Sequence, residues 1–129
     1  MTMEREIKFR GKRIDNGEWV YGYVIYNQWH NTYKIDTGLY GIPSATVDPE
    51  IIGQYTGLKD RDGKEIYEGD IVRVPAIGYR IESGEYDTYS IRFTEGSFYI
   101  YPFNSSINHL LADVSDECEI IGNIHERVE

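Results

Sequence analysis

The sequence is poor in cysteine, in long apolar runs and in positive charge. One cysteine among 129 residues excludes an internal disulfide framework and a multi-cysteine zinc site. No segment approaches the roughly 20 apolar residues that a membrane helix needs, so no membrane association is expected. The start, Met1 to Glu6, lacks the apolar stretch of a signal peptide. We therefore expect a protein of the cytoplasm, in a reducing compartment.

Acidic residues outnumber basic ones. Lys and Arg number 13 and Asp and Glu number 22, which gives a net charge of −9. Broad binding to nucleic acid requires a positive surface, so the acid excess argues against it. The imbalance is uneven, because residues 1–40 carry 6 basic and 5 acidic groups, whereas residues 41–129 carry 7 and 17.

The length and composition predict one globular domain over residues 1–129. Hydrophobic residues make up 40% of the chain, which is typical of a folded protein with its own core. Tyrosine is unusually frequent, with 12 Tyr against 4 Phe and 2 Trp. Tyrosine suits half-buried strands and protein interfaces, because its ring can be buried while its hydroxyl remains hydrogen-bonded.

Alternating polar and apolar residues predict strands along most of the chain. Ile7–Ile14 and Trp19–Tyr26 flank Asn16-Gly17, a pair typical of a type I′ hairpin turn, in which both residues have φ > 0. Further strands are predicted at Thr32–Ile35, Ile51–Thr56, Ile71–Val74, Tyr79–Glu82, Tyr86–Phe93, Phe98–Tyr101 and Glu119–Ile124.

One short helix is predicted near residues 106–114. Ile107, Leu110, Leu111 and Val114 follow the spacing of an apolar helical stripe, and Ser105 or Ser106 could cap it. The sequence therefore predicts an all-β fold, either a small barrel or a curved antiparallel sheet built from hairpins, with this single helix.

The sequence contains no recognisable catalytic or cofactor motif. Asp60-x-Asp62-Gly63 resembles the start of a calcium loop, but its glycine is in the fourth position and not the sixth. A solvated type I′ turn is the better interpretation. The histidines have no metal-ligand spacing. The carboxylates of Glu117 and Glu119 should raise the pKa of the Cys118 thiol between them. We expect no catalytic residue, no cofactor and no metal, and hence no enzyme; the alternative is an active site assembled from carboxylates and histidines that are scattered in the sequence.

Two groups of residues are candidates for contact with a partner. Basic residues and one tryptophan lie on the predicted N-terminal hairpin, where they could bind nucleic acid, although a solvated outer face is the simpler interpretation. They are Lys8, Arg10, Lys12, Arg13 and Trp19. Tyrosines on two predicted neighbouring strands could instead form a core face or a surface for a protein partner or a second subunit. They are Tyr86, Tyr89, Tyr99 and Tyr101.

The order of several segments resembles the YopX family of phage and prophage proteins. These segments are Ile7–Lys12, Asn16–Gly22, Ile52–Asp60, Asp62–Val72 and Glu119–Glu126. The resemblance implies a mostly-β domain, with small-barrel character around Gly69–Val72, and a phage or prophage setting. It implies no catalytic residue. The resulting hypothesis is a non-catalytic accessory protein that binds a host or phage protein, or forms a homo-oligomer. The alternative is association with nucleic acid through the basic hairpin.

Overall fold

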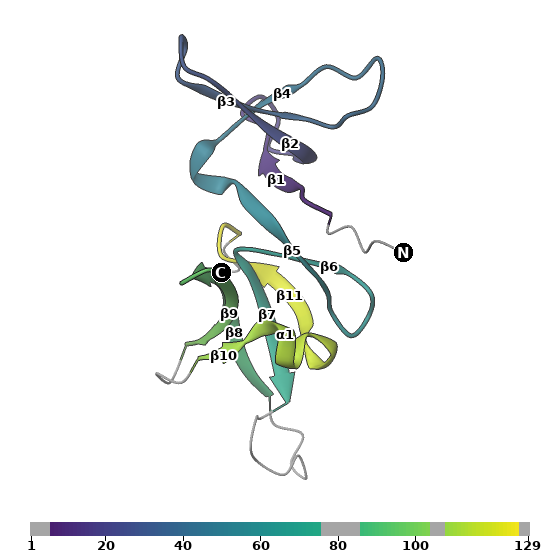
Figure 1. Ribbon diagram of the computed structural model, residues 1–129, viewed down its shortest axis with the longest axis vertical. Helices are drawn as coiled ribbons and strands as arrows, with labels where there is room; N and C mark the ends of the chain where they lie inside the picture. The colour runs from purple at the N-terminus through teal and green to yellow at the C-terminus, as the bar shows by residue number, and fades with distance from the viewer. Residues whose placement is uncertain (1–5, 76–85, 104–107, 127–129) are drawn as a thin grey trace. The chain divides into compact units, whose positions relative to one another are not determined.

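The computed structural model describes residues 6–75, 86–103 and 108–126, and the chain divides into two compact units (Figure 1). Unit 1 is Met1–Gly57 and unit 2 is Leu58–Glu129. The strands form two antiparallel sheets, with one short helix. Neither sheet closes into a barrel within the described residues, so the curved sheet is confirmed rather than the barrel. That residues 1–129 fold as one domain stays a prediction.

Unit 1 is built on a sheet in the order β4-β3-β2-β1-β5. Its elements are β1 (Phe9–Lys12), β2 (Trp19–Asn27), β3 (Thr32–Asp36), β4 (Ala45–Val47), a 3₁₀ turn at Pro49–Ile51, and the first part of β5 (Gly53–Lys59). The predicted N-terminal hairpin is confirmed, with Lys12 paired to Trp19 and Phe9 to Gly22. The strand β5 continues into unit 2, where it pairs with β6 (Glu65–Tyr67).

The turn between β1 and β2 differs from the type I′ prediction. The Arg13 N–H donates to the Glu18 carbonyl, and the Gly17 N–H donates to the Arg13 carbonyl, both at 2.9 Å. Gly17 has φ +73°, whereas Asn16 does not take a positive φ. The loop is therefore longer than two residues, and its glycine alone supplies the left-handed conformation.

The turn at Asp62-Gly63 is also not type I′, and it is not fully solvated. Gly63 alone has a positive φ, of +83°. Asp60 is only 5% exposed, and its carboxylate accepts hydrogen bonds from backbone N–H groups that offset the cost of burying its charge. Oδ1 accepts from Asp62 and Lys64, each at 2.9 Å, and Oδ2 accepts from Ile120 at 3.1 Å. Asp60 thus ties the β5–β6 hairpin to β11.

Unit 2 contains the second sheet, in the order β10-β9-β8-β7-β11. Its strands are β7 (Asp70–Pro75), β8 (Tyr86–Thr94), β9 (Ser97–Pro102), β10 (His109–Leu110) and β11 (Glu119–Asn123). Between Ile120 and Gly122 the pairing of β11 with β7 shifts, which marks a bulge at Ile121. The predicted strand Tyr79–Glu82 lies outside the described residues.

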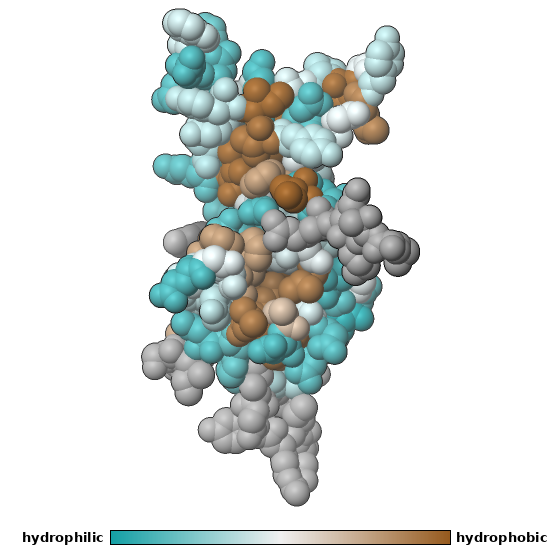
Figure 2. Space-filling view, viewed as in Figure 1, coloured by the Kyte–Doolittle hydropathy of each residue, from teal (hydrophilic) through white to brown (hydrophobic). Residues whose placement is uncertain are grey.

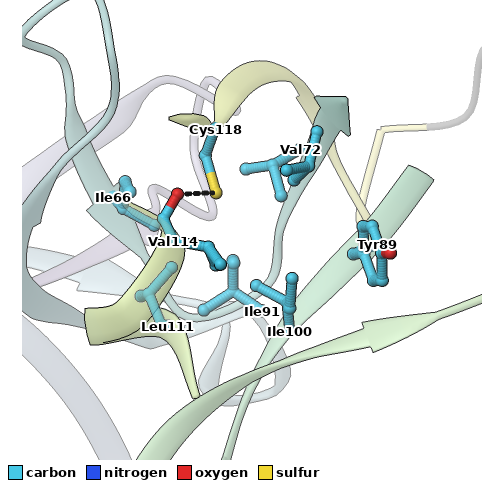
Figure 3. Packing of buried hydrophobic residues seen from close by; sticks show 9 residues of the cluster. Ile66, Val72, Tyr89, Ile91, Ile100, Leu111, Val114 and Cys118 are labelled. Carbon is cyan, nitrogen blue, oxygen red and sulfur yellow. Dashed lines mark hydrogen bonds between the residues drawn. The ribbon is translucent and has the colours of Figure 1, made fainter. Parts of the chain in front are cut away.

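One face of this sheet carries the core of unit 2 (Figure 3). Side chains from β7, β8 and β9 pack there against β6, the helix α1 (Leu111–Val114) and Cys118. The buried residues are Ile66, Val72, Val74, Tyr89, Ile91, Ile100, Leu111, Val114 and Cys118. Packing against α1 and β6 is what removes this face from water.

The helix is shorter than predicted. It begins at Leu111, and the two residues before it form β10. Leu110 pairs with Tyr99 and His109 with Ile100, so the edge of β9 recruits this segment as a strand. Helical spacing was a misleading signal at Leu110, because backbone pairing with β9 outweighs the propensity of a short helix. Ile107 and the predicted serine caps lie outside the described residues.

Candidate interaction surfaces

One face of β2 in unit 1 presents a row of apolar and aromatic side chains. Tyr21 is 46% exposed, Tyr23 60% and Ile25 45%. The intervening residues Gly22 and Val24 are more buried, as the alternation of a strand requires. We call Tyr21, Tyr23 and Ile25 the β2 stripe. In Figure 2 apolar side chains reach the surface of each unit among polar ones.

Basic residues border the β2 stripe on the same face. Antiparallel pairing places Arg10 opposite Tyr21 and Lys12 opposite Trp19. The Arg10 guanidinium lies 4.6 Å from the centre of the Trp19 ring, and Lys12 Nζ lies 5.2 Å from it. These are cation–π contacts within the protein itself. The structure therefore brings together three predicted nucleic-acid residues: Arg10, Lys12 and Trp19.

The positive groups of the predicted nucleic-acid surface are largely engaged within the chain. Arg10 is only 8% exposed. Lys8 Nζ lies 3.6 Å from Glu6 and 5.2 Å from the centre of the Tyr55 ring. Arg13 directly follows β1, where its backbone forms a bridge with Val47, and its guanidinium donates two hydrogen bonds to Asp15, at 2.9 and 2.7 Å. This pair raises the pKa of Arg13 and lowers that of Asp15.

The four predicted tyrosines do not form one surface. Tyr89 is 4% exposed and belongs to the core, where burial, and then the charge of Asp87, raise its phenol pKa. Tyr99 and Tyr101 lie on the opposite, outer face, because they pair with Arg92 and Ser90 rather than with core residues. For Tyr86 the structure describes only its place in β8. The prediction is therefore wrong for Tyr89, and an interaction surface at Tyr86, Tyr99 and Tyr101 stays a prediction.

Arginine and tyrosine meet on the outer face of the unit 2 sheet. The Arg92 guanidinium lies 4.9 Å from the centre of the Tyr101 ring, and its Nε donates to Ser90 Oγ at 3.3 Å. Farther along this face, Arg73 of β7 donates to Glu119 of β11, and Arg61 lies 2.9 Å from the same carboxylate. The hydrogen bond from Arg73 is the main cause that lowers the pKa of Glu119.

An apolar hollow of about 400 Å³ lies beside β11 in unit 2. Its wall includes Phe103, Ile121 and Ile124, which are 55%, 50% and 51% exposed. Ile71 and Gly122 also line it, together with Asn123 and Glu126. We call this hollow the β11 groove. The sequence alone does not reveal this groove, because Ile121 and Ile124 belong to a run that is typical of an ordinary strand.

A second missed feature is Trp29, at the turn between β2 and β3. Its side chain is 85% exposed. The Asn27 side chain accepts hydrogen bonds from the N–H groups of Trp29 and His30, at 2.9 and 3.3 Å, and Asn31 takes φ +51°. These bonds give the turn a defined shape. The signal in the sequence was the pair of asparagines flanking an isolated tryptophan.

Cys118 has the properties of a structural thiol. It is fully buried, and its thiol donates to the Val114 carbonyl at 3.3 Å (Figure 3). Its pKa is raised to about 12, as predicted, but burial is the largest cause, followed by Asp60 and then Glu117. Among residues 6–75, 86–103 and 108–126 no three His, Cys, Asp or Glu side chains cluster as a metal site would require. No helix in those ranges is long and apolar enough to cross a membrane.

Comparison with known proteins gives a family and a structural relative. The family model described as YopX protein matches residues 8–129. A solved structure, the crystal structure of protein EF1440 from Enterococcus faecalis, is similar at 25% identity and a TM-score of 0.60. That similarity covers 95% of this chain and 96% of the other. A search of curated protein sequences finds no match. The family model spans nearly the whole chain, so this protein belongs to the YopX family.

Proposed function

We propose that this chain is a protein-binding module without catalysis, an accessory protein in the phage or prophage setting that its family resemblance implies. The observation that carries the proposal is the β2 stripe. Three successive outward positions of one strand, Tyr21, Tyr23 and Ile25, are aromatic or aliphatic and each is about half exposed. Grouped apolar exposure of this kind marks interfaces, and tyrosine is among the residues that interfaces favour.

The surroundings of the stripe support a protein partner over nucleic acid. Arg10 is buried against Trp19, and Arg13 is paired with Asp15. A protein binds nucleic acid through several Lys and Arg side chains that reach the phosphates. The net charge of −9 on this protein would add long-range repulsion of the phosphates. An apolar strip whose bordering cations are already engaged within the chain instead suits a protein surface that presents apolar side chains.

Site-specific photo-crosslinking in bacterial cells tests the proposal. Tyr23 is replaced by p-benzoyl-phenylalanine, and Phe93, an aromatic residue of unit 2 that is 50% exposed, is replaced in a control. We expect a protein adduct from position 23 that survives nuclease treatment and is missing from position 93. Adding Tyr21→Ser and Ile25→Ser should abolish the adduct without unfolding the chain. An adduct that nuclease removes would support the nucleic-acid alternative, and absence of any adduct would refute the stripe as an interface.

A further inference from the structure

Trp29 is presented as a protruding apolar knob. It is 85% exposed although its turn is well ordered by hydrogen bonds. Besides the two hydrogen bonds that Asn27 Oδ1 accepts, the Tyr26 hydroxyl donates to Asn31 Oδ1 at 3.0 Å, and the ring centres of Tyr26 and Tyr33 lie 4.8 Å apart. A shallow hollow of about 360 Å³ adjoins the Trp29 side chain. A large indole held out from its own strand gains stability once another surface covers it.

The β11 groove has the volume and the apolar lining to receive such a ring. Its volume of about 400 Å³ exceeds that of one indole, and its walls are the isoleucine and phenylalanine side chains described above. Gly122 is part of its lining, and a Cβ built there would meet no atom within 4 Å. A flat ring can therefore lie over the Gly122 backbone without displacing the sheet.

The two surfaces are complementary in charge. Residues 27–34, which comprise the turn and the adjoining ends of β2 and β3, contain one lysine and one histidine, and no acid. Unit 2, which carries the groove, has 7 basic and 15 acidic residues, a net of −8, and Glu126 lines the groove itself. A turn without acids can approach this unit with little repulsion, and Lys34 adds attraction. Tyr40 is also fully exposed, but its loop follows Asp36 and lacks this complementarity.

We propose that Trp29 of one copy inserts into the β11 groove of a second copy. The contact joins two different surfaces, so it is heterologous, and an open assembly keeps one unused knob at one end and one unused groove at the other. Association then adds copies one at a time. The weight-average mass should rise with concentration and continue past that of a dimer. This inference goes beyond the proposed function and does not depend on the β2 stripe.

Two single variants separate the knob from the groove. Trp29→Ala removes the knob at an exposed position, and Gly122→Val fills the groove at a position where a Cβ meets open space. Both should keep the circular dichroism spectrum and unfolding midpoint of the parent, so loss of association cannot be ascribed to misfolding. Tyr40→Ala is the matched control, an exposed loop aromatic outside the proposed contact.

Sedimentation equilibrium over a wide concentration range reads out the mass. We expect Trp29→Ala and Gly122→Val each to remain monomeric, and Tyr40→Ala to associate like the parent. Mixing the two monomeric variants should restore association, but only to a one-to-one pair, because the first keeps its groove and the second keeps its knob. A parent that stays monomeric, a Trp29→Ala variant that still associates, or a mixture that does not pair would overturn the proposal.

Discussion

At the scale of single residues, Cys118 is the clearest case of chemistry suppressed by packing. With a pKa of about 12, only about one thiol in ten thousand is ionised near pH 8. We predict that an aromatic disulfide reagent labels the native protein at least ~100-fold more slowly than the protein unfolded in urea. Labelling kinetics followed by absorbance check this. Rapid labelling of the native protein, with the unfolding midpoint unchanged, would contradict the burial of the thiol.

Residue-level prediction from the sequence was limited by burial. The alternation of side chains along a strand puts Tyr99 and Tyr101 on one face, and Lys8, Arg10 and Lys12 on one face of the first strand. It could not show that Tyr89 lies in the core, because that depends on which face α1 covers. Nor could it show that Arg10 is buried, because the aromatic ring that covers it comes from the neighbouring strand. The first fact depends on a contact between segments distant in the sequence, and the second on how side chains pack across the β1–β2 hairpin.

At the scale of elements, two glycines in strands should respond differently to the same substitution. A Cβ at Gly22 in β2 would lie 2.0 Å from the Asp36 carbonyl oxygen of β3, whereas a Cβ at Gly122 in β11 meets nothing within 4 Å. We predict that Gly22→Ala destabilises unit 1 by more than about 2 kcal/mol, and that Gly122→Ala changes stability by less than about 1 kcal/mol. Urea unfolding followed by tryptophan fluorescence, which reports on unit 1, and by Cys118 labelling, which reports on unit 2, measures both. Equal effects of the two substitutions would contradict the close approach at Gly22.

The strands themselves were largely predictable, and the short connections were not. The pattern from Ile7 to Tyr26 specified a hairpin, since alternation and turn residues agreed. The prediction of a type I′ turn was wrong, because the Arg13 N–H donates to the Glu18 carbonyl and this leaves four residues in the loop. A type I′ turn does occur at Glu95-Gly96, with φ of 50° and 83°, at a pair that includes no asparagine. Strand twist and pairing select the turn there, more than the turn residues do.

At the scale of the whole molecule, acidification should weaken unit 2 through Glu119. Its pKa is lowered below the ordinary 4.5 by hydrogen bonds from Arg73 and Arg61. A lowered pKa in the folded state stabilises the fold at pH values above the unfolded-state pKa, and this stability is lost as the pH falls through the folded-state pKa. We predict that Glu119→Gln lowers the midpoint of urea unfolding near pH 7. Near pH 3 the midpoints of the variant and the parent should lie closer together, because the parent carboxylate becomes protonated.

The neighbouring Glu117→Gln provides the comparison for that pH series. Glu117 is exposed, so its substitution should leave the pH dependence of the urea midpoint as in the parent. If both variants changed the midpoint equally at each pH, the effect would come from overall charge and not from the two arginines at Glu119.

The division of the chain at Gly57 and Leu58 falls inside a strand, and this affects how the protein can be recombined. The first residues of β5 pair with β1, and its last residues belong to the hairpin with β6. If the chain were divided between Gly57 and Leu58, β5 would be split, and each half would keep only part of this strand. Chimeras between family members should therefore fold when the crossover leaves β5 intact, for example within the Asp60–Lys64 turn, and fail when it falls within β5. The segment that can be exchanged between family members is therefore one that keeps β5 whole, and it does not end at the boundary between the two compact units.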